Sequence, residues 1–566
     1  ALVKDEILVV YYTQDDSIDE TALNSYLKES LPSYMLPNYL KVLKSIPLTS
    51  NGKIDRKQLE NLHINYSANS IYVAPRNETE QKLVEIWQEI LGIEKVGIQD
   101  NFFELGGHSL MVGQVINQIY KHLEGNLTYK EFFQDPIIER IAKSITKESY
   151  NPIPQVEKQA YYPLTPSQHR IWVLSQLEGG SQAYNMAGVV SLIGELDVNK
   201  FKSAFVQLIA RHEVLRTYFK ANGEGEIHQY VVDVNELNFD ITLHNFEGKS
   251  KEEINSCIHK EQLIAFDLTK APLLRVSLLQ INEEEHLLSF TIHHIIGDGW
   301  SMELLTSELI STYNKLLDNK DYKKEPLSIQ YKDYSVWLQS QLESESYKNS
   351  EVYWLDEFQG DLPILSLPSF KKRPLILTYN GKTVSHQFSK VFLSKLKQFS
   401  KAHDATLFIT LMSGINALLY RYTNQDDIIV GTPIAGREHP DLEHQIGLYL
   451  NTLAIRTQLK DDFGFEDLLQ QQKQTLLEAY EHQIYPFDAL VSRLDLKRDT
   501  SRSALFDVMV VLQNQNQVTS ISSNNQNLEG IQIKPYELER KTSQVDVSFV
   551  FTEENEGLHL EIEYNT

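Results

Sequence analysis

The sequence predicts a multidomain protein in which a small α+β region, a helical bundle and a large α/β region follow one another. At 566 residues the chain is too long for a single hydrophobic core. Short apolar runs around one helical stretch come first, then helical periodicity, and then a long region that mixes helix and strand patterns. Two polar, aperiodic segments separate the three regions, and we expect linkers there.

Residues 1–63 make up the small α+β region. Apolar runs at Ile7–Tyr12 and Leu40–Leu43 indicate strands, and Asp19–Leu31 indicates a helix that is closed off by prolines. The chain starts within a strand-like run and shows no signal peptide, so we expect it to be cut from a longer protein. The first linker covers residues 64–76.

Residues 77–147 are expected to form a bundle of about four helices. Asn77 is the expected N-cap of the first, with Glu80 placed to reach back in a capping box. The apolar face of this helix comprises Leu83, Ile86, Trp87, Ile90 and Leu91. A second helix begins at Ser109, and shorter ones are expected at Tyr129–Phe133 and Ile137–Ile145. The second linker, residues 148–160, bears prolines and is extended in character.

The remaining chain predicts two α/β regions, residues 161–346 and 347–566. In the first, helical patterns occur at Ser167–Leu177, Val198–His212 and Ser301–Leu317, and strand patterns at Leu273–Gln280 and Leu287–His293. The second begins near Tyr347. It contains an Asn-, Gln- and Ser-rich patch, residues 513–527, that we interpret as an exposed loop, and it ends short of an expected last helix.

Composition excludes several classes of function. The net charge of −24 argues against nucleic-acid binding, which needs a basic surface. No apolar stretch approaches the roughly 20 residues that cross a bilayer, so we expect a soluble protein without a membrane partner. The presence of a single cysteine, Cys257, excludes internal disulfides and zinc clusters and fits a cytoplasmic location. We interpret Cys257 itself as a half-buried helix residue.

The first candidate site is Ser109, in the run DNFFELGGHSL (100–110). Two glycines and His108 precede a serine that starts a helix. Such a serine can be a simple N-cap, but helix N-termini also favour phosphate groups through free N–H groups and the helix dipole. A phosphodiester on this hydroxyl would lie in a favourable field. The segment LGGHSL, with residues 76–147 around it, resembles peptidyl carrier proteins, which implies 4′-phosphopantetheine on Ser109.

The second candidate site is IHHIIGDGWS (292–301), which follows a strand-like apolar run. Imidazole suits proton transfer near neutral pH, and Asp298-Gly299 closes a tight loop. A metal pair is one alternative reading, but adjacent histidines at a strand end point to opposite faces, so we expect no metal ion. A buried, hydrogen-bonded histidine pair is the other. The pattern His293-His294-x-x-x-Asp298-Gly299 resembles the active-site motif of nonribosomal peptide synthetase condensation domains.

The third candidate site is PLTSNGKIDRKQL (47–59), whose Asn-Gly dipeptide predicts a turn with a basic tip. Together with SYMLP (33–37), the segment resembles the last signature of adenylation domains, whose C-terminal subdomain ends with a lysine that contacts the acyl-adenylate. Lys53 matches this lysine. The large adenylation core does not precede it in this chain, so we expect no complete adenylation activity.

Further segments of the chain resemble condensation-domain signatures and occur in the order of that family. They are TPSQHRIWVL (165–174), RHEVLRTYF (211–219), YKDYSVWL (331–338), IGLYLNTLAIR (446–456), YPFDAL (485–490) and RDTSRSALFDV (498–508). The resemblance implies two lobes, each like chloramphenicol acetyltransferase, with a tunnel between them for carrier-bound substrates. It identifies the chain as a nonribosomal peptide synthetase fragment: an adenylation C-terminal subdomain, a peptidyl carrier protein and a condensation domain.

The resemblance also assigns roles. His294 acts on the acceptor amine, as a general base or as a positioning group, and Gly299 contributes its amide. His293 supports the structure, and Asp298 pairs with an arginine, for which Arg437 is the candidate.

The donor thioester is carried on Ser109, and the amine belongs to an aminoacyl group on a downstream carrier. The expected partners are the upstream adenylation core, downstream adenylation and carrier domains, and a phosphopantetheinyl transferase. His108 before the serine, and the absence of an epimerase segment, favour an L-configured donor. The alternatives are an ester-forming or coenzyme A-dependent acyltransferase of the same fold, and a non-catalytic recruitment domain.

Overall fold

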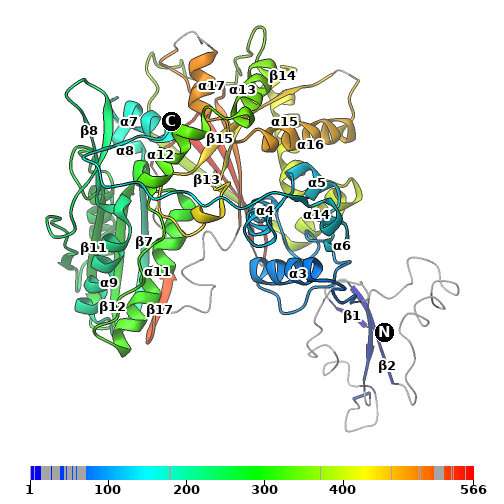
Figure 1. The fold of residues 1–566 in the computed structure, drawn as a ribbon, viewed down its shortest axis with the longest axis horizontal. Helices are drawn as coiled ribbons and strands as arrows, with labels where there is room; N and C mark the ends of the chain where they lie inside the picture. The colour runs from blue at the N-terminus through cyan, green and yellow to red at the C-terminus, as the bar shows by residue number, and fades with distance from the viewer. Residues whose placement is uncertain are drawn as a thin grey trace. The chain divides into compact units, whose positions relative to one another are not determined.

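The computed structural model describes residues 2–4, 7–13, 27, 39–43, 46–47, 54, 59, 72–177, 180–369, 371–460, 462–494, 496, 499–514, 528–536, 538, 541–554 and 556–566. The chain divides into two compact units, shown in Figure 1. The first comprises Ala1–Gly107 and Asp135–Ser144, and the second His108–Gln134 and Ile145–Thr566. Lys53, almost all of the helix expected at Asp19–Leu31 and most of the loop expected at 513–527 lie outside the described residues.

The first unit contains a three-stranded sheet in the order β1-β2-β3. Its strands are β1 (Leu2–Lys4), β2 (Ile7–Tyr12) and β3 (Tyr39–Val42). β1 and β2 are antiparallel, and β2 and β3 are parallel. Both strands expected from the apolar runs are therefore present. The unit also contains α3 (Glu78–Leu91) and α6 (Ile138–Ser144).

The start of α3 differs from the expected capping box. The Asn77 side chain caps the helix by accepting a hydrogen bond of 2.9 Å from the backbone N–H of Glu80. The Glu80 carboxylate does not return to the backbone of Asn77. It accepts the backbone N–H of Arg76 at 2.8 Å and pairs with the Arg76 guanidinium at 2.6 Å. A charge-assisted bond to the neighbouring arginine outcompetes a bond to a neutral amide, so that part of the prediction was wrong.

The second unit begins with the other two helices of the expected bundle. They are α4 (Ser109–Leu123) and α5 (Tyr129–Gln134). Two short strands, β4 (Gly125–Asn126) and β5 (Thr146–Lys147), pair antiparallel beside them. All four helices expected between residues 77 and 147 are present, and each begins within one residue of its expected start.

The N-terminal lobe is a five-stranded sheet in the order β10-β11-β12-β7-β17. The strands are β7 (Asn185–Gly194), β10 (Thr242–Asn245), β11 (Leu274–Asn282), β12 (Glu285–His293) and β17 (Ile531–Pro535). Around it lie β6 (Tyr162–Pro163), α7 (Pro166–Ser175), α8 (Gly180–Ala183), η2 (Glu213–Arg216), β8 (Thr217–Ala221), β9 (Ile227–Val231), η3 (His294–Ile296) and α12 (Tyr331–Gln341).

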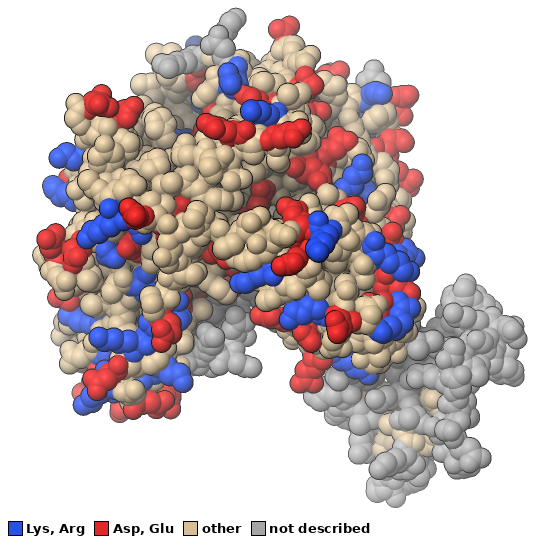
Figure 2. Space-filling model, viewed as in Figure 1, with Lys and Arg blue, Asp and Glu red and all other residues tan. Residues whose placement is uncertain are grey.

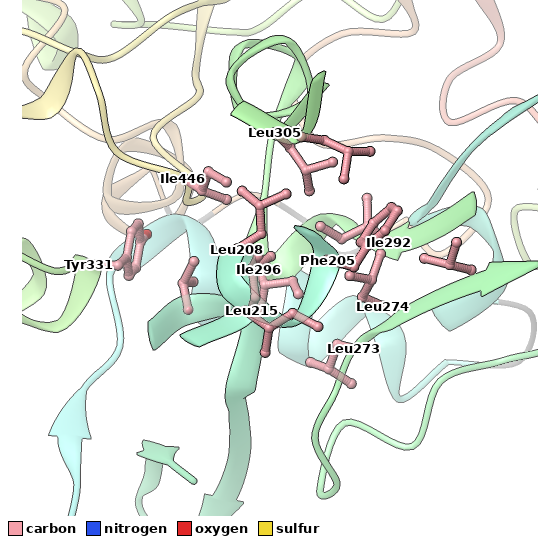
Figure 3. Close-up of a cluster of buried hydrophobic side chains, with 14 of the residues drawn as sticks. Phe205, Leu208, Leu215, Leu273, Leu274, Ile292, Ile296, Leu305, Tyr331 and Ile446 are labelled. Carbon is pink, nitrogen blue, oxygen red and sulfur yellow. The ribbon is translucent and has the colours of Figure 1, made fainter. Parts of the chain in front are cut away.

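The two faces of this sheet are covered by different helices, because side chains alternate along each strand. Leu278 and Leu288 pack in the large core with α9 (Val198–Arg211) and α11 (Gly299–Asp318). Their neighbours Leu279 and Leu287 pack instead with α10 (Lys251–Gln262). Figure 3 shows the large core, where Phe205, Leu274, Ile292, Ile296 and Leu305 converge. The loop after β12 is thereby anchored through Ile296.

The C-terminal lobe is a six-stranded sheet in the order β13-β19-β18-β16-β14-β15. Its strands are β13 (Gly381–Ser389), β14 (Asp427–Ile434), β15 (Asn451–Gln458), β16 (Val508–Asn514), β18 (Val547–Glu554) and β19 (Gly557–Asn565). The helices of this lobe are α13 (Glu345–Glu357), α14 (Lys390–Ala402), α15 (Leu407–Thr423), η4 (Pro440–Leu442), α16 (Phe465–Glu481) and α17 (Phe487–Arg493).

The chain crosses back from the C-terminal to the N-terminal lobe twice, which the sequence analysis did not foresee. Strand β17 pairs antiparallel with β7, although it lies within residues 347–566. Leu442, Ile446, Leu448 and Tyr449 are buried in the large core of the N-terminal lobe. We call residues 436–449 the crossover loop. It brings residues from the second half of the sequence to the end of β12.

The segment 148–160, expected as a free linker, is held against the second unit. Ile153 is buried in the large core, and its N–H donates to Asp441 at 3.0 Å. The Tyr150 hydroxyl donates to the same carboxylate at 2.6 Å, and the N–H of Val156 donates to Asp333 at 2.9 Å. The extended backbone was predicted correctly, but the segment is not free along its whole length, because Asp441 and Asp333, far away in the sequence, hold it.

The surface carries both signs of charge. On the face in Figure 2, Lys and Arg are interspersed with Asp and Glu over the described residues. In the described part of the chain, no helix is both long and apolar enough to cross a membrane.

Candidate active site and carrier attachment site

The candidate active site is the turn between β12 and α11. β12 ends at His293, η3 covers His294–Ile296, and α11 starts at Gly299 with Asp298 as its N-cap. Apolar residues on both sides of the turn, Ile292 and Ile295, are fully buried. These buried side chains anchor the turn, and the polar side chains His293, His294 and Asp298 lie between or beside them.

His293 faces the protein interior and is fully buried. Its Nδ1 accepts the backbone N–H of Ile295 at 3.2 Å, and its Nε2 lies 3.5 Å from the Ser175 hydroxyl. Burial lowers the pKa of His293 to about 3, and the charges of His294 and Arg275 act in the same direction. A neutral imidazole with both nitrogens engaged in the interior is suited to support the turn.

His294 is only half-buried, and the centre of its ring lies 6.4 Å from that of Tyr184. Its backbone N–H donates to the carbonyl of Tyr184 at 2.8 Å, which fixes the main chain at this residue. The Nδ1 atom of its ring is fully buried, and the ring is close enough to the backbone of His294 and Gly297 for hydrogen bonds that raise its pKa. Burial lowers the pKa of His294, while the Asp298 carboxylate opposes that shift. The ring is therefore neutral near pH 7.

Asp298 and Arg437 are brought together, 139 positions apart in the chain, by the crossover loop. Arg437 Nη2 lies 3.3 Å from Asp298 Oδ1, and each side chain is 2% exposed. Asp298 Oδ1 also accepts the N–H of Ser301 at 2.8 Å and lies 2.7 Å from its hydroxyl. Asp298 Oδ2 accepts the N–H of Tyr449 at 3.0 Å. Since both carboxylate oxygens are used internally, this residue shapes the turn and has no oxygen left for a substrate.

The crossover loop holds Arg437 through further contacts. Arg437 Nη1 donates to the carbonyl of Gln445 at 2.7 Å, and the guanidinium lies 4.2 Å from the centre of the Tyr449 ring. The loop turns sharply at Gly436, where φ is +64° and a Cβ would come within 1.9 Å of the Tyr449 carbonyl oxygen. Only glycine fits that position without displacing the backbone.

Gly299 is exposed and is the first residue of α11. An added Cβ would meet no atom within 4 Å, so its backbone borders open space. This position suits an amide that contacts a ligand at a helix N-terminus.

The two lobes also meet near His294 through an ion pair. Arg170 Nε on α7 lies 3.4 Å from Asp488 Oδ1 on α17. The positive charge of Arg170 is one of the influences that lower the pKa of His294. The segments TPSQHRIWVL and YPFDAL, which the sequence analysis singled out separately, are therefore in contact.

Ser109 is the first residue of α4, and His108 occupies the N-cap position in an extended conformation without capping the helix through its side chain. The first-turn N–H groups are thus placed as a phosphate group requires. Burial lowers the pKa of His108 to about 4, so it is neutral near pH 7. Ser109 is half-exposed and forms a side-chain hydrogen bond with Tyr480. These residues fit a phosphodiester-linked arm on the Ser109 hydroxyl.

Three further residues that support the turn, Ser301, Tyr449 and Tyr184, were not predicted from the sequence. Ser301 carries a local signal, because the third residue after an N-cap aspartate offers its N–H to that carboxylate. Tyr184 and Tyr449 hold His294 and Asp298 through backbone atoms, which leave no mark on the sequence, and the Tyr449 ring also packs against Arg437.

Two lobes of mixed α/β structure, with a histidine turn at their junction, define a class of acyl-transfer domain, and comparison with known proteins gives its family. The family model described as "Condensation domain" matches residues 158–566, and that described as "Phosphopantetheine attachment site" matches residues 81–145. Bacitracin synthase 3 of Bacillus licheniformis is 40% identical over 563 residues, which is 99% of this chain and 8% of that protein. Surfactin synthase subunit 1 of Bacillus subtilis (strain 168) is 39% identical over 565 residues, 99% of this chain and 15% of that protein.

Solved structures agree in fold. The X-domain from teicoplanin biosynthesis superposes with a TM-score of 0.67 at 24% identity, covering 73% of this chain and 92% of that one. A four-domain nonribosomal peptide synthetase bound to AMP and glycine gives a TM-score of 0.65 at 22% identity, covering 73% of this chain and 32% of that one. The chain belongs to the condensation-domain family of nonribosomal peptide synthetases, and it also carries a phosphopantetheine attachment site. The expected family and the two-lobed fold are confirmed.

Proposed function

We propose that this chain joins a carrier-bound acyl donor to the α-amine of an aminoacyl acceptor on a downstream carrier, and that His294 serves the reaction. One observation carries the proposal. His293 and Asp298 are buried and spend their polar atoms on the protein, whereas the His294 side chain is half-buried at the end of β12. A turn built this rigidly around one available imidazole is suited to a substrate amine.

In the proposed reaction, the amine nitrogen forms a bond to the donor carbonyl carbon, and the carbon–sulfur bond breaks. The nitrogen loses one proton, and the released thiolate gains one. His294, neutral because burial lowers its pKa, accepts the amine proton as a general base or holds the amine by a hydrogen bond. The Gly299 amide borders open space and is placed to contact the reacting centre. Because both reactants are tethered to carriers and held in one site, their effective concentration is high, and this accelerates the reaction.

Ser109 is the proposed attachment residue. Bound 4′-phosphopantetheine would carry the donor as a thioester. The start of α4 supplies N–H groups for the phosphate, and the neutral His108 adds no charge beside it. We expect a phosphopantetheinyl transferase to install the arm.

The expected neighbours of this chain are an upstream adenylation core and downstream adenylation and carrier domains, because the chain spans only 8% to 15% of the length of the curated relatives described above. Lys53 is proposed as the lysine of an adenylation C-terminal subdomain. An L-configured donor is proposed from His108 and from the lack of an epimerase segment in the sequence. The single cysteine is consistent with a cytoplasmic location.

The test is intact-protein mass spectrometry on the full chain. A transferase and an aminoacyl derivative of coenzyme A should add one acylated arm to the wild type and none to Ser109→Ala. Mixing the loaded protein with an aminoacyl carrier should move the donor to the acceptor as a dipeptidyl thioester. Loading without transfer would indicate a recruitment domain, and transfer to a hydroxyl or to free coenzyme A would indicate one of the other acyltransferases.

A further inference from the structure

A cluster of three potential metal ligands lies at the edge of the N-terminal lobe, on elements that the proposed function does not use. His244 belongs to β10, and Cys257 and Glu261 belong to α10. One ligand atom from each side chain lies within 4.8 Å of the other two. His244 Nε2 and Glu261 Oε1 are 2.8 Å apart.

The fold explains why these side chains meet. Ile254 and Ile258 of α10 pack on the sheet, with Leu279 of β11 among their neighbours. His244 pairs with Leu279 in the parallel register of β10 and β11. Paired residues on adjacent strands project to the same face, so His244 points toward α10. Cys257 and Glu261 are one helical turn apart, and their side chains therefore share one face of α10.

We propose that His244, Cys257 and Glu261 bind one zinc ion. An imidazole, a thiolate and a carboxylate are all ligands that Zn²⁺ accepts, whereas a thiolate disfavours Mg²⁺ and Ca²⁺. The thiolate and the carboxylate together balance the charge of the ion. Two ligands one turn apart on a helix form a spacing known from zinc sites. The side chains of His244 and Glu261 are 29% and 26% exposed, which leaves access for the ion and a position for water as a fourth ligand.

Without an ion, the same residues form a hydrogen bond between His244 and Glu261 beside a protonated thiol. Burial raises the pKa of Cys257, and the negative charge of Glu261 acts in the same direction. Binding must therefore displace the thiol proton, as in other thiolate sites. The ion would tie β10, a four-residue edge strand, to the helix beside it. We infer a stabilising role, because the ligands belong to neither the His294 turn nor the crossover loop.

The experiment uses the full chain with Ser109→Ala, so that no pantetheine thiol is added and Cys257 is the one thiol present. The protein is saturated with Zn²⁺ and dialysed, and bound zinc is measured by elemental mass spectrometry. We expect one zinc per chain, and loss of retention in Cys257→Ser and in His244→Gln. His259→Gln, on the same helix outside the cluster, is the matched control and should retain the metal.

Co²⁺ provides a second readout that does not depend on the variants. A thiolate-to-Co²⁺ charge-transfer absorption should appear in the parent protein, and Zn²⁺ should protect Cys257 from a thiol reagent. If zinc retention is equal in the parent and Cys257→Ser, the proposal is wrong. It is equally wrong if the parent protein shows no charge-transfer band. Circular dichroism without metal checks that the variants fold, and if one does not, the parent Co²⁺ spectrum decides.

Discussion

Replacing Asp298 with alanine removes a buried carboxylate that lies within hydrogen-bonding distance of Ser301, Tyr449 and Arg437. The guanidinium of Arg437 would then be a buried charge without its counterion, because both side chains of the pair are 2% exposed. Breaking such a pair from one side costs about 3–5 kcal/mol. Loss of the N-cap of α11, about 1 kcal/mol, falls within the same perturbation and does not simply add to it.

The free energy of unfolding is measured by urea titration of the full chain, followed by tryptophan fluorescence. Asp298→Ala should lower the main transition by about 3–5 kcal/mol and lower condensation activity with it. Combining it with Arg437→Met should restore part of the loss, because no uncompensated charge remains. Asp240→Ala is the control: its pair with Lys202 leaves the carboxylate 73% exposed, so the change should leave the unfolding transition almost where it is in the wild type. If Asp298→Ala unfolds like the wild type while turnover is abolished, the carboxylate acts in the chemistry and its structural role is refuted.

Three further predictions test the supports of the site. The pKa of His293 is about 3 in the folded protein and roughly 6.5 in the unfolded chain, so acidification from pH 6.5 to 3 should destabilise the wild type progressively, by up to roughly 5 kcal/mol. His293→Gln should show a smaller fall in the urea midpoint over that pH range. An equal fall would contradict the role of His293 as a buried neutral imidazole. Asp441→Ala should release the segment 148–160 and increase cleavage there in limited proteolysis, since its carboxylate holds that segment by two hydrogen bonds; unchanged cleavage would show that Asp441 does not hold it. Gly436→Ala should lower the melting temperature and the activity together, because the new Cβ would lie 1.9 Å from the Tyr449 carbonyl oxygen. A variant that melts like the wild type would show that the crossover loop can relax.

The local parts of the site follow from the sequence. The apolar run before His293 predicts a strand, the aspartate-glycine pair predicts a turn, and alternation along the strand places the two histidines on opposite sides. The structure has the strand and the turn, with β12 ending at His293 and α11 starting after Asp298, and His293 is buried while His294 is half-buried. The helices predicted at Ser167–Leu177, Val198–His212 and Ser301–Leu317 are likewise present within about two residues, whereas none of the helices of the C-terminal lobe was predicted individually.

The long-range parts could not be derived in this way. Arg437 was chosen through the family resemblance, since nothing in local spacing links it to Asp298. The short strand β17 has the pattern of any edge strand, and the sheet that it joins depends on tertiary packing. The linker 148–160 reads as free because its partners, Asp441 and Asp333, lie far away in the sequence. The cluster around Cys257 was missed for the same reason, because its histidine comes from a different element.

The most direct test is single-turnover dipeptide formation by the full chain, with donor preloaded on Ser109 and an aminoacyl carrier as acceptor. His294→Ala should lower the rate by about 10²–10⁴-fold, the contribution of a positioned acid–base group, and should leave loading of Ser109 unchanged. A general base should show a rate that falls on acidification below the usual histidine pKa of about 6.5, since burial lowers the pKa of His294. The same pH profile for His294→Ala gives the fall that protonation of the acceptor amine causes by itself. If His294→Ala forms dipeptide at nearly the wild-type rate, the reaction proceeds without this side chain and the proposed role of His294 is wrong.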